Sequence, residues 1–228
     1  MQKNHFFETL RSLLFGAAMV AACAALSCGT GLAADQQPVA LSFYSESGHF
    51  KVEGSFFTDA DRSTAWHVLT DYASIPHFVN SMKVSKVESQ DEHDLVLDQE
   101  GEGGFLFFTQ RIHLLLSVHE QPEKSIVFQD TSHKDFDYYQ GSWTIKKADS
   151  GQGLEVIYTL DAQGHFDGPG FLVSDSIQGN VKDLLESVRR EMGIQQAALD
   201  QKKSSKDMVA ENPKANQLSN QLPNQLNK

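Results

Sequence analysis

The sequence predicts an α+β domain over residues 48–199, in which a curved antiparallel sheet of seven strands packs against one long C-terminal helix. Seven separate runs alternate apolar and polar residues, and the last six of them are joined by short connections. Short connections between consecutive strands require antiparallel pairing. An amphipathic stripe then follows between residues 177 and 192, and packing it against the apolar face of the sheet buries both surfaces.

The domain begins with a strand and a short helix. Residues 50–56 alternate apolar and polar, as in a half-buried strand. Residues 58–61, Thr-Asp-Ala-Asp, resemble a capping box, and apolar residues follow at helical spacing as far as Tyr72. The residue before a proline avoids α geometry, so the helix is expected to end at Ile75. Residues 76–79 are expected to form a second, short turn that controls access to the space between the sheet and the C-terminal helix.

Six further runs have the pattern of strands, and the third of them is the most informative. Its alternate positions from Leu106 to Val118 are nearly all apolar, so this face should point inward. A strand of this length spans close to ~48 Å at about 3.4 Å per residue, which favours a curved sheet. The glycines at positions 101, 103 and 104 are assigned to the turn before it. The six runs are residues 83–90, 93–101, 105–119, 124–131, 136–147 and 153–164.

A single helix closes the domain. The motif Gly168-Pro169-Gly170 interrupts the last strand pattern. Six apolar residues then recur at the spacing of one helical face: Ile177, Val181, Leu184, Leu185, Val188 and Met192. This stripe predicts a helix that lies on the apolar face of the sheet.

The N-terminal residues 1–34 have the pattern of an export signal. Lys3 and Arg11 precede an apolar stretch, residues 13–26, that is shorter than the roughly 20 residues of a transmembrane helix. Cleavage after residue 34 predicts an exported, periplasmic protein. The motif ending at Cys23 also resembles a lipobox, so a lipoprotein anchored at the membrane surface is the alternative. If residues 1–34 are removed by cleavage, the mature chain has no cysteine, because Cys23 and Cys28 both lie within them.

Two segments flank the predicted domain. Residues 35–47 are interpreted as an N-terminal linker. Residues 200–228 are rich in Lys, Ser, Asn and Gln, and Asn-Gln-Leu occurs three times within them. A polar segment of this kind buries too little apolar surface to offset its ordering entropy, so the sequence predicts a disordered tail.

Composition and motifs exclude several classes of function. The chain is 40% hydrophobic and 21% charged, which is typical of a globular protein. Its formal net charge of −11 argues against a nucleic-acid partner, because phosphate binding requires a basic face. The sequence has no P-loop, dinucleotide fingerprint or Gly-x-Ser-x-Gly motif, and its histidines lack metal-ligand spacing. We therefore expect no cofactor and no metal site.

Two stretches resemble the SRPBCC or START-like superfamily, closest to its polyketide cyclase and coenzyme-Q-binding branch. One is residues 65–72, Ala-Trp-His-Val-Leu-Thr-Asp-Tyr, which continues through 75–79. The other is residues 141–145, Gly-Ser-Trp-Thr-Ile, followed by 154–160. The resemblance covers residues 48–193. It implies a helix-grip fold with a deep cavity between sheet and helix, which binds lipids, isoprenoid quinones or aromatic polyketides. Some relatives catalyse cyclisation or dehydration, but the branch has no universal catalytic motif, so no catalytic residue is assigned.

Strand and helix phase predict which side chains point into this cavity. Most candidates are apolar or aromatic and could equally be ordinary core residues. Gln110 and Asp130 are the polar exceptions, and a buried polar group needs a partner from the protein, water or a ligand. The candidates are Phe56, Leu97, Phe108, Gln110, Ile112, Phe128, Asp130, Tyr139, Trp143, Tyr158, Ile177, Val181 and Leu184.

Three functions remain open at this point. The first is a binding module that carries or sequesters a hydrophobic small molecule, with a possible contact to the membrane surface. The second is an enzyme of cyclase or dehydratase type that uses Asp130 or a cavity tyrosine as acid and base. The third is a protein-interaction module with a collapsed cavity, whose protein partner the sequence does not identify.

Overall fold

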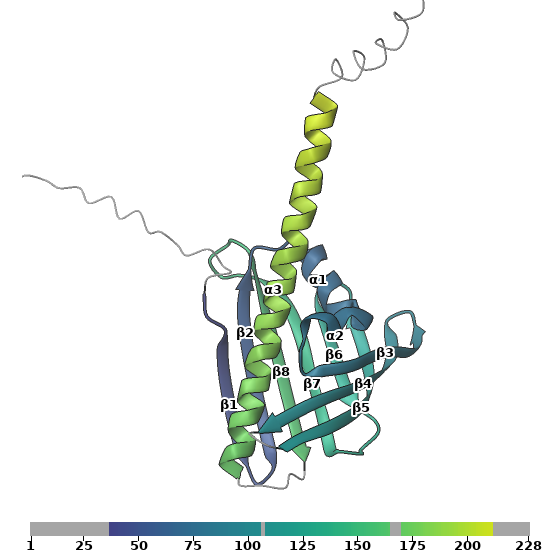
Figure 1. Ribbon diagram of the computed structural model, residues 1–228, viewed down its shortest axis with the longest axis vertical. Helices are drawn as coiled ribbons and strands as arrows, with labels where there is room; N and C mark the ends of the chain where they lie inside the picture. Colours follow the sequence, from purple (N-terminus) through teal and green to yellow (C-terminus); the bar gives the residue numbers. More distant parts are fainter. Residues whose placement is uncertain (1–36, 106–107, 165–169, 212–228) are drawn as a thin grey trace, which may run out of the picture. The chain divides into compact units, whose positions relative to one another are not determined.

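A computed structural model describes residues 37–105, 108–164 and 170–211, with side chains except at 103–110, 170–173 and 208–211. Within these ranges it forms one antiparallel sheet, and a single long helix, α3, lies across one face of it (Figure 1). The predicted α+β architecture is confirmed. The sheet has eight strands where the sequence predicted seven.

The order of strands in the sheet is β1-β2-β8-β7-β6-β5-β4-β3. The second strand of the chain, β2, therefore pairs with the last strand, β8. A short helical segment, α1-η2-α2, links β2 to β3 and contacts α3. The elements are β1 (Ala40–Glu46), β2 (His49–Thr58), α1 (Arg62–Thr70), η2 (Tyr72–Ser74), α2 (Ile75–Phe78), β3 (Met82–Asp91), β4 (Asp94–Phe105), β5 (Phe108–Gln121), β6 (Ser125–Asp130), β7 (Phe136–Lys147), β8 (Leu154–Gly164) and α3 (Gly170–Glu211).

The additional strand is β1, which lies within the predicted linker at 35–47. It pairs with β2 along its whole length, from Ala40 opposite Ser55 to Glu46 opposite His49. As an edge strand, β1 is held by backbone hydrogen bonds on one side only. Leu41 and Phe43 alternate with exposed residues but are only half-buried, and this alternation is shorter than that of the other strands.

The β4–β5 hairpin corrects a second prediction. The glycines at 101, 103 and 104 lie inside β4, and the hairpin closes where Phe105 pairs with Phe108. A glycine was expected to mark the turn, but these residues have extended backbone. Gly101 packs beside the carbonyl oxygen of Ser81, at 3.4 Å from where a Cβ would stand, and Glu102 N donates to the same oxygen. Part of the glycine run thus allows close backbone contact.

The predicted phase of β5 is confirmed where its side chains are described. Leu114, Leu116 and Val118 are buried, whereas Ser117 and His119 on the alternate face are exposed. This alternation places one row of β5 side chains against the core and the other in solvent.

The first helix is shorter than predicted. It ends at Thr70, and Ile75 has helical backbone (φ −50°, ψ −44°) at the start of a separate turn, although it precedes a proline. The capping-box hydrogen bond at the start of α1 does not form. Instead, the Thr58 hydroxyl accepts a hydrogen bond from Ala60 N at 3.2 Å.

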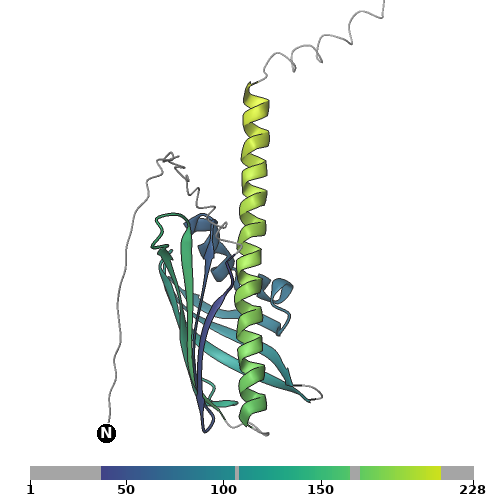
Figure 2. The ribbon, with the colours of Figure 1, turned by 90° about the vertical axis from the view of Figure 1, so that its left-hand side faces the viewer.

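The C-terminal helix is longer than predicted. Val181, Leu185, Val188 and Met192 are buried, and the helix then continues past the sheet to Glu211 (Figure 2). Residues 200–211, predicted as disordered tail, belong to it, because they contain good helix formers and no glycine or proline. Residues 212–228 lie outside the described ranges, as does the predicted signal at 1–34. No described helix is long and apolar enough to cross a membrane.

Candidate functional site

A cavity of about 110 Å³ lies between the inner face of the sheet, α3 and the short helical segment after β2. The strands β4 to β8 supply most of its wall, because their inward side chains meet there. The segment from α1 to α2 covers it with Val68, Leu69, Tyr72, Ile75 and Phe78, and α3 closes it with Leu184 and Val188.

The structure brings together about half of the predicted cavity residues. The side chains that line the cavity are Leu97, Phe128, Tyr139, Trp143, Tyr158 and Leu184. Four others belong to the core or pack against it without lining the cavity: Phe56, Ile112, Ile177 and Val181. The side chains of Phe108 and Gln110 lie outside the described residues. That any of these residues contacts a ligand stays a prediction.

Aromatic rings from three neighbouring strands form one wall of the cavity. Phe128 on β6 stacks on Tyr158 of β8, with ring centroids 6.2 Å apart and planes 22° apart. Trp143 on β7 lies 4.7 Å from Tyr158, centroid to centroid. Gly141 makes room for this arrangement, since a Cβ at that position would stand 2.5 Å from the Phe128 ring. The absence of a side chain at Gly141 therefore leaves room for the aromatic rings, which three paired strands of the sheet hold side by side.

Gln99 and the tyrosine hydroxyl groups interrupt this apolar lining. The hydroxyl groups of Tyr139 and Tyr158 hydrogen-bond to each other, and burial raises the pKa of both phenols, so both stay neutral. Gln99 on β4 donates from Nε2 to the Ser85 hydroxyl at 3.0 Å. A mostly apolar cavity with a few fixed polar groups is the usual design of a site that binds and orients a small molecule.

A hydrogen bond connects the α1–α2 segment, which covers the cavity, to strand β5 of the sheet. The Tyr72 hydroxyl donates to Glu120 Oε1 at 2.6 Å, and burial, followed by this hydrogen bond, raises the pKa of Tyr72. The lining residues of this segment were missing from the sequence-based candidates. Their helical spacing was visible in the sequence, but spacing alone does not say whether an apolar face meets the sheet or a cavity.

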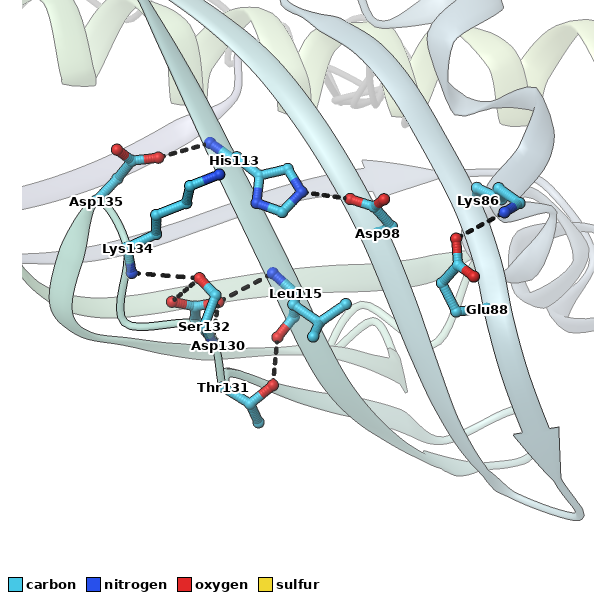
Figure 3. A network of polar contacts seen from close by, with 10 residues as sticks. All are labelled: Lys86, Glu88, Asp98, His113, Leu115, Asp130, Thr131, Ser132, Lys134 and Asp135. Carbon is cyan, nitrogen blue, oxygen red and sulfur yellow. Dashed lines mark hydrogen bonds and ion pairs between the residues drawn. The ribbon is translucent and has the colours of Figure 1, made fainter.

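Asp130 is fully buried at the end of β6, and its carboxylate binds the turn that follows instead of lining the cavity. Its Oδ1 accepts hydrogen bonds from Leu115 N (3.0 Å) and Ser132 N (3.1 Å). Its Oδ2 accepts from the Ser132 hydroxyl (3.1 Å), as drawn in Figure 3, and from His133 N (3.0 Å). Four donors fill the roughly four lone-pair positions of the carboxylate. Asp130 is thus occupied in holding the turn, and the enzyme hypothesis loses its favoured acid.

The outer face of β4 and β5 carries separate histidine–carboxylate pairs. His113 Nε2 lies 2.7 Å from Asp98 Oδ1, and His119 Nδ1 lies 2.7 Å from Asp94 Oδ1 (the first pair is drawn in Figure 3). Within the described ranges, no group of three or more His, Cys, Asp or Glu side chains is placed to hold a metal ion.

Comparison with known proteins identifies the fold and the family. The family model "Polyketide cyclase / dehydrase and lipid transport" matches residues 58–189. The chain therefore belongs to this family, which implies binding of hydrophobic small molecules. No curated protein matches the sequence.

Several solved structures are similar to the chain. A protein of Thermus thermophilus is 18% identical with a TM-score of 0.54, covering 62% of this chain and 96% of its own. The Zhui aromatase/cyclase of a Streptomyces species is 12% identical (TM-score 0.54; 64% and 94% covered). A STAR-related lipid transfer protein of Xanthomonas axonopodis is 12% identical (TM-score 0.50; 68% and 99% covered). At these identities the likeness shows a common START-like fold and says nothing about the ligand.

Proposed function

We propose that this member of the polyketide cyclase / dehydrase and lipid transport family is an exported carrier that binds a hydrophobic small molecule between its sheet and α3. The observation that carries the proposal is the aromatic wall of Phe128, Trp143 and Tyr158, which faces an apolar cavity instead of solid core. Burial of a ligand there gains about 25 cal/mol per Å² of apolar surface removed from water.

Binding without chemistry is favoured by the state of the polar groups. The phenols of Tyr139 and Tyr158 are held neutral by burial, and Asp130 is saturated by donors of the following turn and of β5. A general acid or base works best when its pKa lies near the operating pH, and raising a phenol pKa moves it further away. These groups are suited to hold a polar atom of the ligand in one orientation.

Export is supported by the sequence alone. The positive and apolar segments of residues 1–34 favour delivery to the periplasm, where a carrier moves apolar molecules through water. Acylation at Cys23 would instead keep the domain at the membrane surface.

Native mass spectrometry on protein purified gently from its own envelope tests this proposal. The expected spectrum contains a defined adduct that solvent extraction releases as a lipid, quinone or aromatic compound, and the intact mass gives the cleavage site and any acyl chain. A matched pair of variants identifies the site. Val118→Phe fills the cavity from β5, whereas Val127→Phe adds the same ring to the exposed outer face of β6.

The adduct is expected to be lost from Val118→Phe and kept by Val127→Phe. A protein that carries no adduct, and takes none up from a panel of lipids and quinones, would contradict the carrier function. An adduct kept by both variants would show that the ligand binds elsewhere.

A further inference from the structure

A second, polar hollow lies beside the cavity and shares one residue with it. This hollow has a volume of about 220 Å³ and lies between the turn Val79–Ser81 and the face of α3. Leu184 lines both spaces, and it is half-buried on the side of α3 that faces the sheet. Leu184 is therefore the boundary between an apolar and a polar compartment.

The two compartments differ in chemistry. The described side chains of the apolar cavity include no charged group, whereas the hollow is lined by Asp183, Glu186 and Arg190. Arg190 donates to the Ser187 hydroxyl at 3.3 Å, and Glu186 lies 3.9 Å from Lys182 on the preceding turn of α3. The lining of the hollow thus holds one more carboxylate than cations.

Neutral hydrogen-bonding groups complete the lining of the hollow. Asn80 comes from the turn before β3, and Asn180 lies on α3. A carboxamide offers two donors and one acceptor oxygen, so the two amides can bind hydroxyl and carbonyl groups from opposite sides.

We propose that the cavity and the hollow form one site for an amphiphile with an uncharged, hydroxyl- or carbonyl-bearing head. This inference rests on the proposed function, because the apolar part of the ligand occupies the cavity. The head lies outside Leu184, between Asn80 and Asn180. A head with a negative charge is disfavoured, because it would approach the carboxylates of Asp183 and Glu186.

Two ligands with the same chain and different heads test the proposal. Monooctanoylglycerol has a neutral diol head, and octanoate is anionic at neutral pH. Titration calorimetry on the mature protein is expected to show about three- to tenfold tighter binding of the glyceride, since each like-charge contact at a wet site is worth a few tenths to about 1 kcal/mol. The double variant Asp183→Asn, Glu186→Gln is expected to bring the two affinities close together by strengthening octanoate binding. Asp175→Asn, at an exposed position of α3 outside both compartments, is the control and should leave the ratio unchanged.

The role of Leu184 has its own readout. Leu184→Ala widens the boundary and is expected to speed the dissociation of monooctanoylglycerol, measured by stopped-flow, whereas Asp175→Asn, outside both compartments, keeps the parent rate.

The possible outcomes distinguish a failure of the proposed head site from a failure of the proposed carrier function. Equal or tighter binding of octanoate, or a ratio that the double variant does not change, overturns the head site and leaves the carrier function standing. Failure of both ligands to bind at millimolar concentration contradicts the carrier function and the head site together.

Discussion

Asp130 and the Tyr139–Tyr158 pair are both buried and polar, yet they play different parts. Asp130 receives four hydrogen bonds from Leu115, Ser132 and His133, so the protein itself satisfies it. The two tyrosines bond to each other at the edge of a cavity. Two hydroxyls that share one hydrogen bond still have one donor proton for a third group. Burial of a polar residue therefore indicates a binding role only when hydrogen-bonding capacity is left over.

Removal of the Asp130 side chain is expected to have the largest effect. Asp130→Ala leaves the backbone N–H groups of Leu115, Ser132 and His133 without their acceptor, and should lower the free energy of unfolding by about 4 kcal/mol. Urea unfolding followed by circular dichroism measures this. The folded fraction should bind ligand as the parent does; weakened binding at full folding would place Asp130 in the site after all.

The second largest effect is expected from alkaline pH, which should lower the free energy of unfolding through the Tyr139–Tyr158 pair. Burial raises both phenol pKa values above the 10.0 of an exposed tyrosine, so the native state keeps protons that the unfolded chain releases. Stability from this source is fully present well below pH 10 and is lost as the pH rises above 10, because the unfolded chain then releases protons that the native phenols keep. Urea unfolding across this range checks the slope. Tyr158→Phe should reduce it, and an unchanged slope would contradict the assignment.

A methyl group added behind the aromatic wall should cost somewhat less. In Gly141→Ala the new Cβ would stand 2.2 Å from the Thr159 carbonyl oxygen and 2.5 Å from the Phe128 ring, so both must move. Overpacking of this kind costs about 1–3 kcal/mol. Ligand affinity should also fall, because Phe128 turns into the cavity. Thermal unfolding and calorimetry measure the two effects, and Gly179→Ala, at a position of α3 with open space and no positive φ, is the control that adds a methyl group without a clash.

Removal of a single cavity hydroxyl should affect stability least. Tyr158→Phe keeps the ring contacts with Phe128 and Trp143 and is expected to change the free energy of unfolding by less than about 1 kcal/mol. Its effect should appear in selectivity, as a loss of preference for ligands that carry a carbonyl or hydroxyl over their hydrocarbon analogues. A variant that unfolds, with selectivity intact in the folded fraction, would make the hydroxyl structural.

The comparison also explains which features the sequence could predict. Leu114, Leu116 and Val118 were placed on the inner face because strict period-two alternation leaves only one buried face. The partners of Asp130 were not visible, because Leu115 lies 15 residues away on a neighbouring strand. Local patterns give the face on which a residue lies, and only the fold gives its partners.

The errors at the ends of the elements have two origins. The glycines of β4 and the edge strand β1 depend on pairing with a neighbouring strand, which the local pattern does not report. Residues 200–211 continue a helix that the buried stripe had already started, so high helix propensity prevailed over their polar composition. Strand pairing thus decided the first two cases, and local helix propensity decided the third.

The central claim is that the space beneath α3 binds an apolar molecule, and energy transfer from Trp143 tests it most directly. In a Trp66→Phe background, Trp143 is the tryptophan of the cavity wall, and the neutral fluorophore N-phenylnaphthylamine serves as acceptor. We predict saturable transfer at one site, lost in Val118→Phe and kept in Val127→Phe. Absence of saturable transfer, or equal transfer in both variants, would contradict the account.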